Sequence, residues 1–402
     1  MANEILTPTM VTREVLRVLH QKLTFVRSIN TQYDSQYAKS GAKIGSSLKI
    51  RLPNEYTVRT GATLTTQDTS EISTTLTVAT QKGVDITFTS QDLTMSLDDF
   101  SKRIIQPAAS VLAASIEADA LSMVKDVYNC VMNIGSALTF AKVMGARKLL
   151  VDNLTPLDDN LTALLNTQDT VDLVDALKGL FQDSQAIKQQ YREGILGRTA
   201  GFEFAENTLL ANFTSGTSVS GICSFVTSGA ISAGPVSGQS AIPVSGTAGT
   251  LVVGDIITFS GMNRCHPESK ADMGTLQQFV VTSAYTGSAN TINVSPTIFT
   301  TGGRQNVFAG APSGDKISKP SVGVSTVLRP SLFYHRDAFA FASADLIMPD
   351  GVDFASRQVM DGISVRIVRQ YAISTDTYPC RLDVLYGYKT IRPQLAARVQ
   401  SN

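Results

Sequence analysis

The sequence predicts an α+β protein in which a long polar β-ribbon leads into one long helix, with an all-β domain inserted further along. Three observations predict this. Apolar and polar residues alternate with period two over residues 46–89, which is typical of half-buried antiparallel strands. Apolar residues recur with helical spacing over residues 97–132. At Thr214 the composition changes to Ser, Thr, Gly and Val without a helical period.

The ribbon takes up residues 46–90. In its first arm, Leu48, Ile50 and Leu52 share one face. The return arm alternates in the same way, at Leu76, Val78, Val84, Ile86 and Phe88. A two-stranded ribbon with a polar tip is marginally stable alone, and its open edges can pair with another chain. We therefore expect a neighbouring molecule to lie under it, which favours assembly over catalysis.

Residues 1–45 precede the ribbon as an N-terminal arm. An amphipathic helix is predicted over 8–28, with an apolar stripe at Val11, Val15, Leu19, Leu23 and Val26. The basic residues Arg13 and Arg17 lie outside this stripe. The helix could dock on its own domain or on a partner chain. The narrow stripe and the polar stretch over 30–47 are the features that favour a partner.

The long helix lies within residues 91–135. Ser96, with Asp99 three residues later, is a capping signal for a helix over 97–132. At 1.5 Å per residue such a helix is about 50 Å long. Pro107 predicts a kink or a restart within it.

Residues 136–213 predict mixed α/β structure. Helices are expected over 138–153, 167–182 and 184–196, followed by a loop and strand with Gly197 and Gly201 as turn residues.

The inserted all-β domain covers residues 214–318, where short alternating runs are separated by turn residues. A long polar loop is expected over 266–278. Mixed structure returns in residues 319–402, with a short helical or loop piece over 334–339. Two paired strands are expected there, over 363–373 and 380–391.

No catalytic or metal site is expected. The three histidines, His20, His266 and His335, lie in different contexts without a nucleophile elbow. His335 is flanked by Arg336 and Asp337, which indicates either a base oriented by an acid or, as we favour, a polar junction. Four separate cysteines predict neither a disulfide framework nor a zinc site. We expect no enzyme activity, no cofactor and no metal.

Charge and hydropathy narrow the choice of partners. The chain has 34 basic and 34 acidic residues, whereas a dedicated duplex-binding domain is expected to show a basic excess. Neutrality suits a protein packed beside copies of itself. The start MANEILTPTM has no secretory signal, and no run approaches the roughly 18 apolar residues of a membrane span. We expect a protein made in a cytoplasm, with no membrane partner.

Five stretches, in their order along the chain, resemble one family. They are QDLTMSLDDFSKRIIQPAASVLAASIEADAL (91–121), YREGILGRTAGFEFAENTLL (191–210), VVGDIITFSGMN (252–263), and LFYHRDAFAFASADL with LYGYKTIRP (385–393). They and the order of parts resemble the major capsid proteins of tailed bacteriophages, which have the HK97-like fold. The likeness is closest to coat proteins of short-tailed Salmonella-type phages, which carry an inserted β-domain.

This resemblance implies a structural role in the virion. The chain would comprise an N-arm, a ribbon called the E-loop (46–90) and a spine helix within a peripheral domain (91–135). An axial domain (136–213) would follow, and 319–402 would complete both domains. Copies would form the pentamers and hexamers of an icosahedral shell around double-stranded DNA, assembled in the host cytoplasm with a scaffolding protein and a portal protein. The candidate intersubunit residues are Arg59, Glu71, Arg13, Arg17 and Glu117.

Two alternatives stay open. An encapsulin-like nanocompartment shell would have the same fold, but the inserted β-domain argues against it. The other is a soluble enzyme or glycan-binding protein with a β-sandwich appendage. A monomer or small oligomer would favour it, as would an ordered ligand site around His335.

Overall fold

The structure is a computed structural model of the chain. It describes residues 15–17, 23–31, 47–64, 66–67, 71–89, 106–177, 197–217, 230–231, 237–245, 249–286, 291–308, 317–319, 325–360 and 363–402. Contacts divide the chain into two units. Unit 1 comprises Met1–Ile50, Ser73–Leu121 and Phe339–Ile391, and unit 2 comprises Arg51–Ile72, Ser122–Ala338 and Arg392–Asn402.

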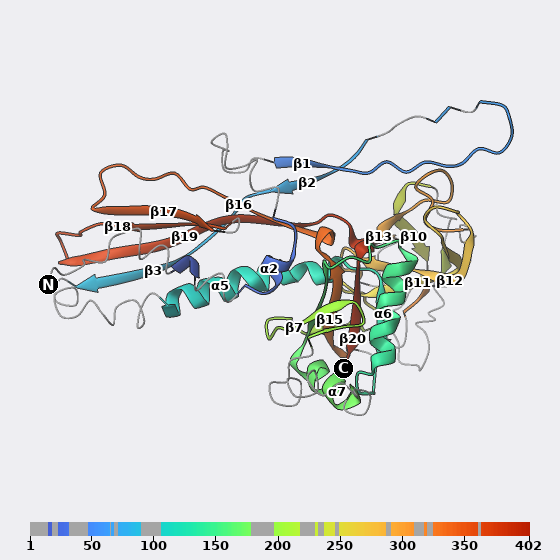
Figure 1. Ribbon diagram of the computed structural model, residues 1–402, viewed down its shortest axis with the longest axis horizontal. Helices are drawn as coiled ribbons and strands as arrows, with labels where there is room; N and C mark the ends of the chain where they lie inside the picture. The colour runs from blue at the N-terminus through green and yellow to red at the C-terminus, as the bar shows by residue number, and fades with distance from the viewer. Residues whose placement is uncertain are drawn as a thin grey trace. The chain divides into compact units, whose positions relative to one another are not determined.

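Unit 1 is built on a five-stranded antiparallel sheet (Figure 1). Its strands are β3 (Thr80–Thr89), β16 (Phe339–Ala344), β17 (Phe354–Met360), β18 (Ile363–Arg369) and β19 (Thr377–Thr390). The long strand β19 is central. It pairs with β3 and β18 along its first part and with β16 along its last. The predicted pairing of two C-terminal strands is confirmed, with Arg366 opposite Asp383.

Helix α5 (Gln106–Leu121) lies along this sheet and buries Leu112 and Ile116. The predicted helix to residue 132 is wrong at its end. A 3₁₀ turn, η2 (Ser122–Asp126), follows α5, and the chain then forms strand β4 (Cys130–Asn133). That strand pairs in parallel with β20 (Ala396–Ser401). Helical spacing of apolar residues cannot reveal a strand partner so distant in sequence. The predicted cap at Ser96 and Asp99 lies outside the described residues.

The predicted helix over 8–28 is not continuous. Residues 15–17 are helical and α2 covers Phe25–Ser28, but Leu23 and Thr24 are not helical. The apolar positions of the stripe that are described, Val15, Leu23 and Val26, are all buried. Val11 and Leu19 lie outside the described residues.

The ribbon consists of β1 (Ser47–Leu52) and β2 (Ile72–Thr77), paired as a two-stranded sheet. Its alternation is as predicted, because Ile50 and Leu76 are buried between exposed neighbours. The return arm, however, ends at β2. Strand β3 instead pairs over ten residues with β19, so the alternation at Val84 and Ile86 belongs to the sheet of unit 1.

Unit 2 contains a seven-stranded sheet in the order β4, β20, β15, β5, β7, β6, with β8 beside β15. The strands not yet defined are β5 (Leu161–Leu165), β6 (Arg198–Thr199), β7 (Phe202–Glu206), β8 (Phe213–Thr214) and β15 (Val327–His335). Helices α6 (Phe140–Asp152) and α7 (Thr167–Leu177) match two predictions; the third, over 184–196, lies outside the described residues. The turn glycines Gly197 and Gly201 have φ of 60° and 82°, as a turn requires.

The core of this part lies between α6 and the sheet. Val143, Ala146 and Leu150 of α6 pack there with Phe202 and Phe333. The short helical piece expected near residue 336 is η3 (Arg336–Ala338), and η4 (Pro393–Leu395) precedes β20.

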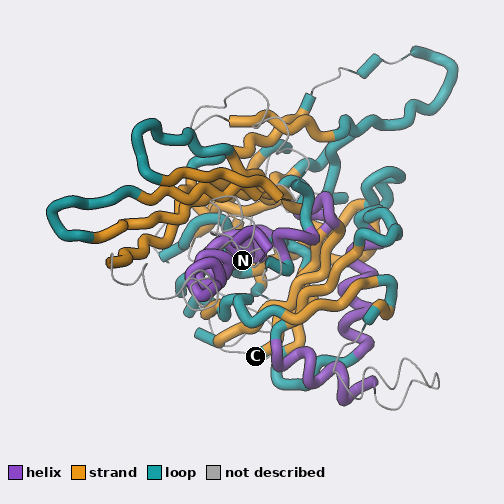
Figure 2. Tube along the Cα trace, turned by 60° about the vertical axis from the view of Figure 1, so that its left-hand side comes forward, coloured by secondary structure: helices purple, strands orange, loops and turns teal. Residues whose placement is uncertain are grey.

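Between β8 and β15 the chain forms a second, six-stranded sheet, here called the insertion. Four of its strands are labelled in Figure 1, and Figure 2 draws all described strands of the chain in orange. Its strands are β9 (Ala230–Ile231), β10 (Gln239–Ser245), β11 (Ile256–Cys265), β12 (Asp272–Val281), β13 (Thr291–Ile298) and β14 (Ile317–Ser318). It has its own apolar core, which includes Phe259 and Phe279. The long loop predicted over 266–278 is wrong: β12 begins at Asp272, and Lys270 donates to the carbonyls of Pro267 and Gly303 to close a tight turn.

Candidate assembly surfaces and the root of the insertion

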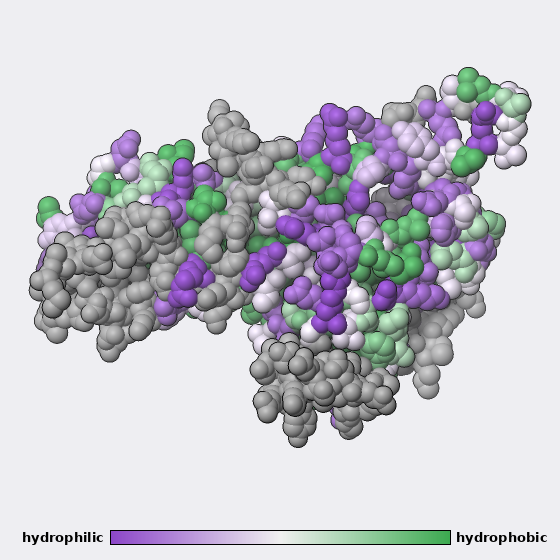
Figure 3. Space-filling model, in the orientation of Figure 1, coloured by the Kyte–Doolittle hydropathy of each residue, from purple (hydrophilic) through white to green (hydrophobic). Residues whose placement is uncertain are grey.

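The ribbon tip exposes apolar side chains that a monomer would ordinarily bury. Tyr56, Val58 and Leu64 are 56%, 95% and 78% exposed. The two sides of the tip are tied together by Gln67, whose side chain accepts from the Thr57 amide at 2.9 Å and donates to the Thr57 carbonyl at 2.6 Å. Figure 3 shows hydrophobic and hydrophilic residues mixed along this loop. Exposed apolar groups gathered on one loop make the ribbon tip a candidate contact surface.

The two ribbon residues predicted from the sequence contact their own ribbon and not each other. Arg59 donates to the carbonyls of Gly61 and Thr63. Glu71 pairs with Arg51 at 3.3 Å, with side chains 60% and 77% exposed. Both residues remain accessible to a neighbouring molecule, and their intersubunit role stays a prediction. Arg13 lies outside the described residues, and Arg17 is exposed in the helical turn over 15–17.

Glu117 is fully buried within unit 1. Its carboxylate accepts hydrogen bonds from the amides of Phe25 and Val26, at 2.6 and 3.3 Å, and from the Thr24 hydroxyl at 2.9 Å. Burial raises the pKa of Glu117, and these hydrogen bonds oppose that rise. The sequence did not reveal this contact, although a glutamate beside Ile116 on an apolar helix face was a signal for a buried partner.

Two further carboxylates organise unit 1, Asp119, which is half-buried, and Asp383. Asp119 on α5 accepts from Lys82 of β3 at 2.7 Å and from the Tyr386 hydroxyl of β19 at 2.5 Å. These contacts fix the helix on the sheet. Asp383, which is fully buried, pairs with Arg366 at 2.6 Å and with Arg381 at 2.9 Å.

His335 has the geometry of a polar junction. It is buried, its Nε2 lies 3.1 Å from Asp158, and its Nδ1 accepts from the Asp337 amide at 3.2 Å. Both ring nitrogens are therefore engaged in joining β15 to neighbouring turns. Within the described residues, no group of His, Cys, Asp and Glu side chains could hold a metal ion.

One stretch of the described chain, Gln106–Asp126, is long and apolar enough to cross a membrane. More than half of it is buried inside the fold, which is typical of a core helix.

The root of the insertion is a neck of two antiparallel segments in unit 2. On entry, Phe213 and Thr214 pair with Leu328 and Val327 on exit. The pairing continues at Ser215, whose amide donates to the Thr326 carbonyl at 2.9 Å. The neck therefore prolongs the seven-stranded sheet towards the insertion.

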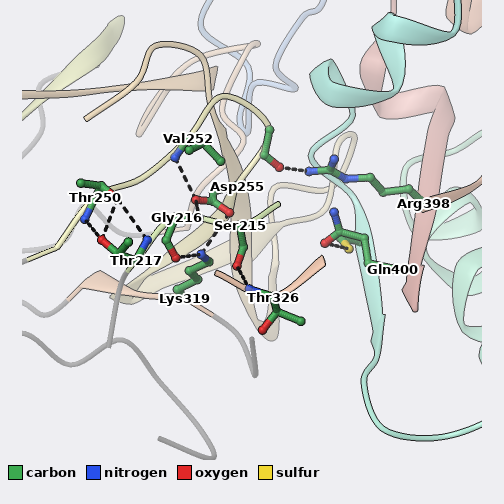
Figure 4. Close-up of polar contacts among 12 residues, drawn as sticks. Ser215, Gly216, Thr217, Thr250, Val252, Asp255, Lys319, Thr326, Arg398 and Gln400 are labelled. Carbon is green, nitrogen blue, oxygen red and sulfur yellow. Dashed lines mark hydrogen bonds and ion pairs between the residues drawn. The ribbon is translucent and has the colours of Figure 1, made fainter. Parts of the chain in front are cut away.

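Asp255 lies beside this neck and is 1% exposed (Figure 4). One carboxylate oxygen accepts from the amides of Gly216 and Val252, at 3.1 and 2.9 Å. The other lies 3.1 Å from the Lys319 ammonium, which is equally buried. Lys319 also donates to the Gly216 carbonyl at 3.4 Å.

Arg398 of β20 binds the same turn from the sheet side. Its guanidinium donates to the Gly254 carbonyl at 2.5 Å, and its side chain is 1% exposed. Burial lowers the pKa of Arg398 and of Lys319, and nearby carboxylates, Asp255 among them, oppose that fall. None of these three charged residues was singled out from the sequence, because their partners are remote in the chain.

Comparison with solved structures found distant likenesses along the whole chain. A protein of Mycobacterium phage Che8 is 13% identical, with 94% of this chain and 90% of that chain covered and a TM-score of 0.49. The mature capsid of bacteriophage PhiM1 is 10% identical over 91% and 84%, with a TM-score of 0.45. A virus-like particle from Pyrococcus furiosus is 7% identical over 97% and 98%, with a TM-score of 0.41. No curated protein matched the chain.

The family is shown by a match of residues 1–400 to the family described as P22 coat protein, gene protein 5. This match covers nearly the whole chain, including the ribbon, α5, the seven-stranded sheet of unit 2 and the insertion. The chain therefore belongs to the P22 coat protein family: it is a major capsid protein of the tailed-phage type, a structural component of the virion rather than an enzyme.

Proposed function

We propose that copies of this coat protein assemble as pentamers and hexamers into a closed icosahedral shell around double-stranded DNA. A scaffolding protein guides a precursor shell, a portal protein takes one vertex, and assembly takes place in the host cytoplasm. Within the family, the chain corresponds most closely to coat proteins of short-tailed Salmonella-type phages, and the insertion to their inserted β-domain. The order of arm, ribbon, long helix and insertion supports this proposal.

The observation that carries the proposal is the ribbon tip. It is a tied, extended element whose apolar residues Tyr56, Val58 and Leu64 are exposed in the single chain. Burying them against a neighbouring copy would gain about 25 cal/mol per Å² of apolar surface. Arg59 lies among these residues and Glu71 follows them in the chain. Their charges would fix the register of the contact with little net energy, about 0–1 kcal/mol for an exposed pair.

The N-terminal arm has a different part in this proposal. Its arginines, Arg13 and Arg17, would face the interior, where they could contact the scaffolding protein or packaged DNA without sequence preference. Glu117 would act indirectly in such contacts, because its carboxylate is occupied by the chain segment that begins at Thr24.

The test is electron microscopy of the purified chain, expressed with and without the scaffolding protein encoded by the same phage. We expect closed shells with scaffold, and tubes or irregular shells without it. A chain that stays monomeric at high concentration in both preparations would overturn the proposal. Nuclease-protected DNA in particles purified from infected cells supports a phage shell, whereas protein cargo alone would point to a nanocompartment.

The ribbon contact has its own variant. Arg59→Glu should lower the yield of closed shells while leaving the circular dichroism spectrum of the monomer unchanged. Lys148→Glu is the matched control, because it makes the same reversal of charge at an exposed residue of α6, which is not part of the ribbon. Equal yields for the two variants would argue against an intersubunit role for Arg59.

A further inference from the structure

We propose that Asp255 is a positioning residue of the insertion: its carboxylate closes the neck and thereby helps to fix the second sheet of unit 2 on the first. Asp255 contacts both segments of the chain that join the insertion to the neck. It binds the Gly216 amide on the entering segment and the Lys319 ammonium on the leaving segment. It also holds its own turn through the Val252 amide.

The backbone around Asp255 leaves little freedom for another arrangement. A Cβ at Gly216 would lie 2.1 Å from the Thr250 carbonyl oxygen, so only glycine allows the entering segment to approach this closely. Gly254 has a φ of 100°, which favours glycine in the turn before Asp255. Thr217 and Thr250 lie beside this close contact, and the backbone amide of each donates to the hydroxyl of the other. The two hydroxyls are 2.8 Å apart.

The polar contacts supply the direction that the apolar contacts lack. The insertion meets β4 in a small apolar cluster of Tyr128, Cys130, Ile256 and Val280. Burial of apolar surface is non-directional, so such a cluster allows small rotations. One directional contact accompanies it, because the Gln278 side chain of β12 accepts from the Cys130 amide at 2.7 Å and donates to the Cys130 carbonyl at 2.8 Å. The Asp255 contacts and the donation from Arg398 to Gly254 are directional and join both crossings and the sheet at one turn.

The closed neck depends on both partners of the Asp255–Lys319 ion pair. Both side chains are at most 2% exposed. Removing one partner leaves an uncompensated buried charge, whereas removing both with little change of shape is far less costly. A neck held in this way should therefore open in either single variant and close again in the double variant, while the insertion's own core around Phe259 and Phe279 is untouched.

The test is hydrogen exchange, followed by mass spectrometry, of the full chain carrying Asp255→Asn, Lys319→Met or both. Amides at Gly216 and Val252 should exchange roughly tenfold faster or more in the single variants. Peptides from β11 and β12 should keep their protection. The double variant should return the neck amides towards the wild-type rate. Arg51→Met, which breaks an exposed pair, is the matched control and should change nothing at the neck.

Two results would overturn the proposal. If β11 and β12 lose protection together with the neck, Asp255 is part of the insertion's folding core and not a positioning residue. If the neck amides are unchanged in both single variants, the apolar cluster and the Gln278 contact with Cys130 position the insertion without the Asp255–Lys319 pair.

A second measurement, of closed shells by electron microscopy, rests on the shell-forming function proposed above. Single variants should yield fewer closed shells than the double variant. The exchange measurement does not depend on assembly, so a failure of wild-type shells would leave it interpretable. Equal loss of shells in all three variants, together with a restored neck in the double, would show that neck closure does not serve assembly.

Discussion

The carboxylate of Glu117 lies 2.6 Å from the backbone nitrogen of Phe25, 92 residues earlier in the chain, and both groups are buried. Helix α2 begins there, and Thr24 makes no side-chain cap of its own. Helix α5 thus supplies the acceptor that the first amides of α2 need. The contact anchors the N-terminal segment, together with the bridge between Asn30 and Ala340 and the ring contact of Phe25 with Phe339.

Replacing Glu117 with alanine should release this anchor. The Phe25 and Val26 amides would lose their acceptor in a buried site, at a cost of about 1–3 kcal/mol for each unsatisfied group. Hydrogen exchange at these two amides and urea unfolding of the monomer would measure it. Glu117→Gln keeps an acceptor oxygen and should lose much less. Equal protection of both amides in wild type and Glu117→Ala would show that apolar packing alone holds the segment.

The same carboxyl predicts a pH dependence. Burial raises the pKa of Glu117 above its ordinary 4.5, with the hydrogen bonds from Phe25, Thr24 and Val26 opposing. The folded chain therefore holds this proton more tightly than the unfolded chain. Its contribution to stability is fully present below pH 4.5 and is lost as the pH rises through the raised folded pKa.

Comparison with Glu117→Gln isolates this effect. The free energy of unfolding of the wild type, minus that of the variant, should fall as the pH rises from about 4 and then level off. Urea titrations at a series of pH values would measure it. A difference that grows with pH would mean that the hydrogen bonds, and not desolvation, dominate the pKa of Glu117.

Two glycines predict opposite effects of the same substitution. A Cβ at Gly83 of β3 would lie 2.5 Å from the Leu382 carbonyl oxygen and 2.6 Å from Asp383. Gly83→Ala should therefore force β3 and β19 apart and destabilise the chain by about 1–3 kcal/mol. Gly145 lies inside α6, where a Cβ would meet Val131 at 3.6 Å, an ordinary contact. Gly145→Ala should stabilise by about 0.5–1 kcal/mol.

Thermal unfolding of the two variants beside the wild type tests this pair. Melting temperatures that move in the same direction would contradict the explanation that a Cβ at Gly83 clashes with β19.

Local patterns predicted the elements whose partners are close in sequence. The alternation at Ile50 and Leu76 predicted the ribbon, and the pairing of β18 with β19 followed from two alternating runs beside one turn. The pattern failed where the partner is remote. Val131 continues a helical spacing yet lies in β4, because β20, at the other end of the chain, supplies its hydrogen bonds.

The buried charges could not be predicted for the same reason. Asp255, Lys319 and Arg398 come together only after both crossings of the neck and the last strand are in place. In sequence each is an isolated charge of the kind that usually lies on the surface. Arg59 and Glu71, which the sequence did single out, are exposed side chains of the ribbon.

The two arginine partners of Asp383 should contribute unequally to the stability of the chain. It is fully buried in β19, where Arg366 binds it at 2.6 Å with a side chain 15% exposed, and Arg381 at 2.9 Å with a side chain 53% exposed. Arg366→Met should cost about 3 kcal/mol or more, because it leaves a buried carboxylate without its desolvated partner. Arg381→Met should cost about 1 kcal/mol or less, since water screens that pair. Urea unfolding of both variants would measure the difference. Equal losses of unfolding free energy in the two variants would show that both arginines hold Asp383 as a unit. Asp383→Asn combined with Arg366→Met should in that case recover most of the stability.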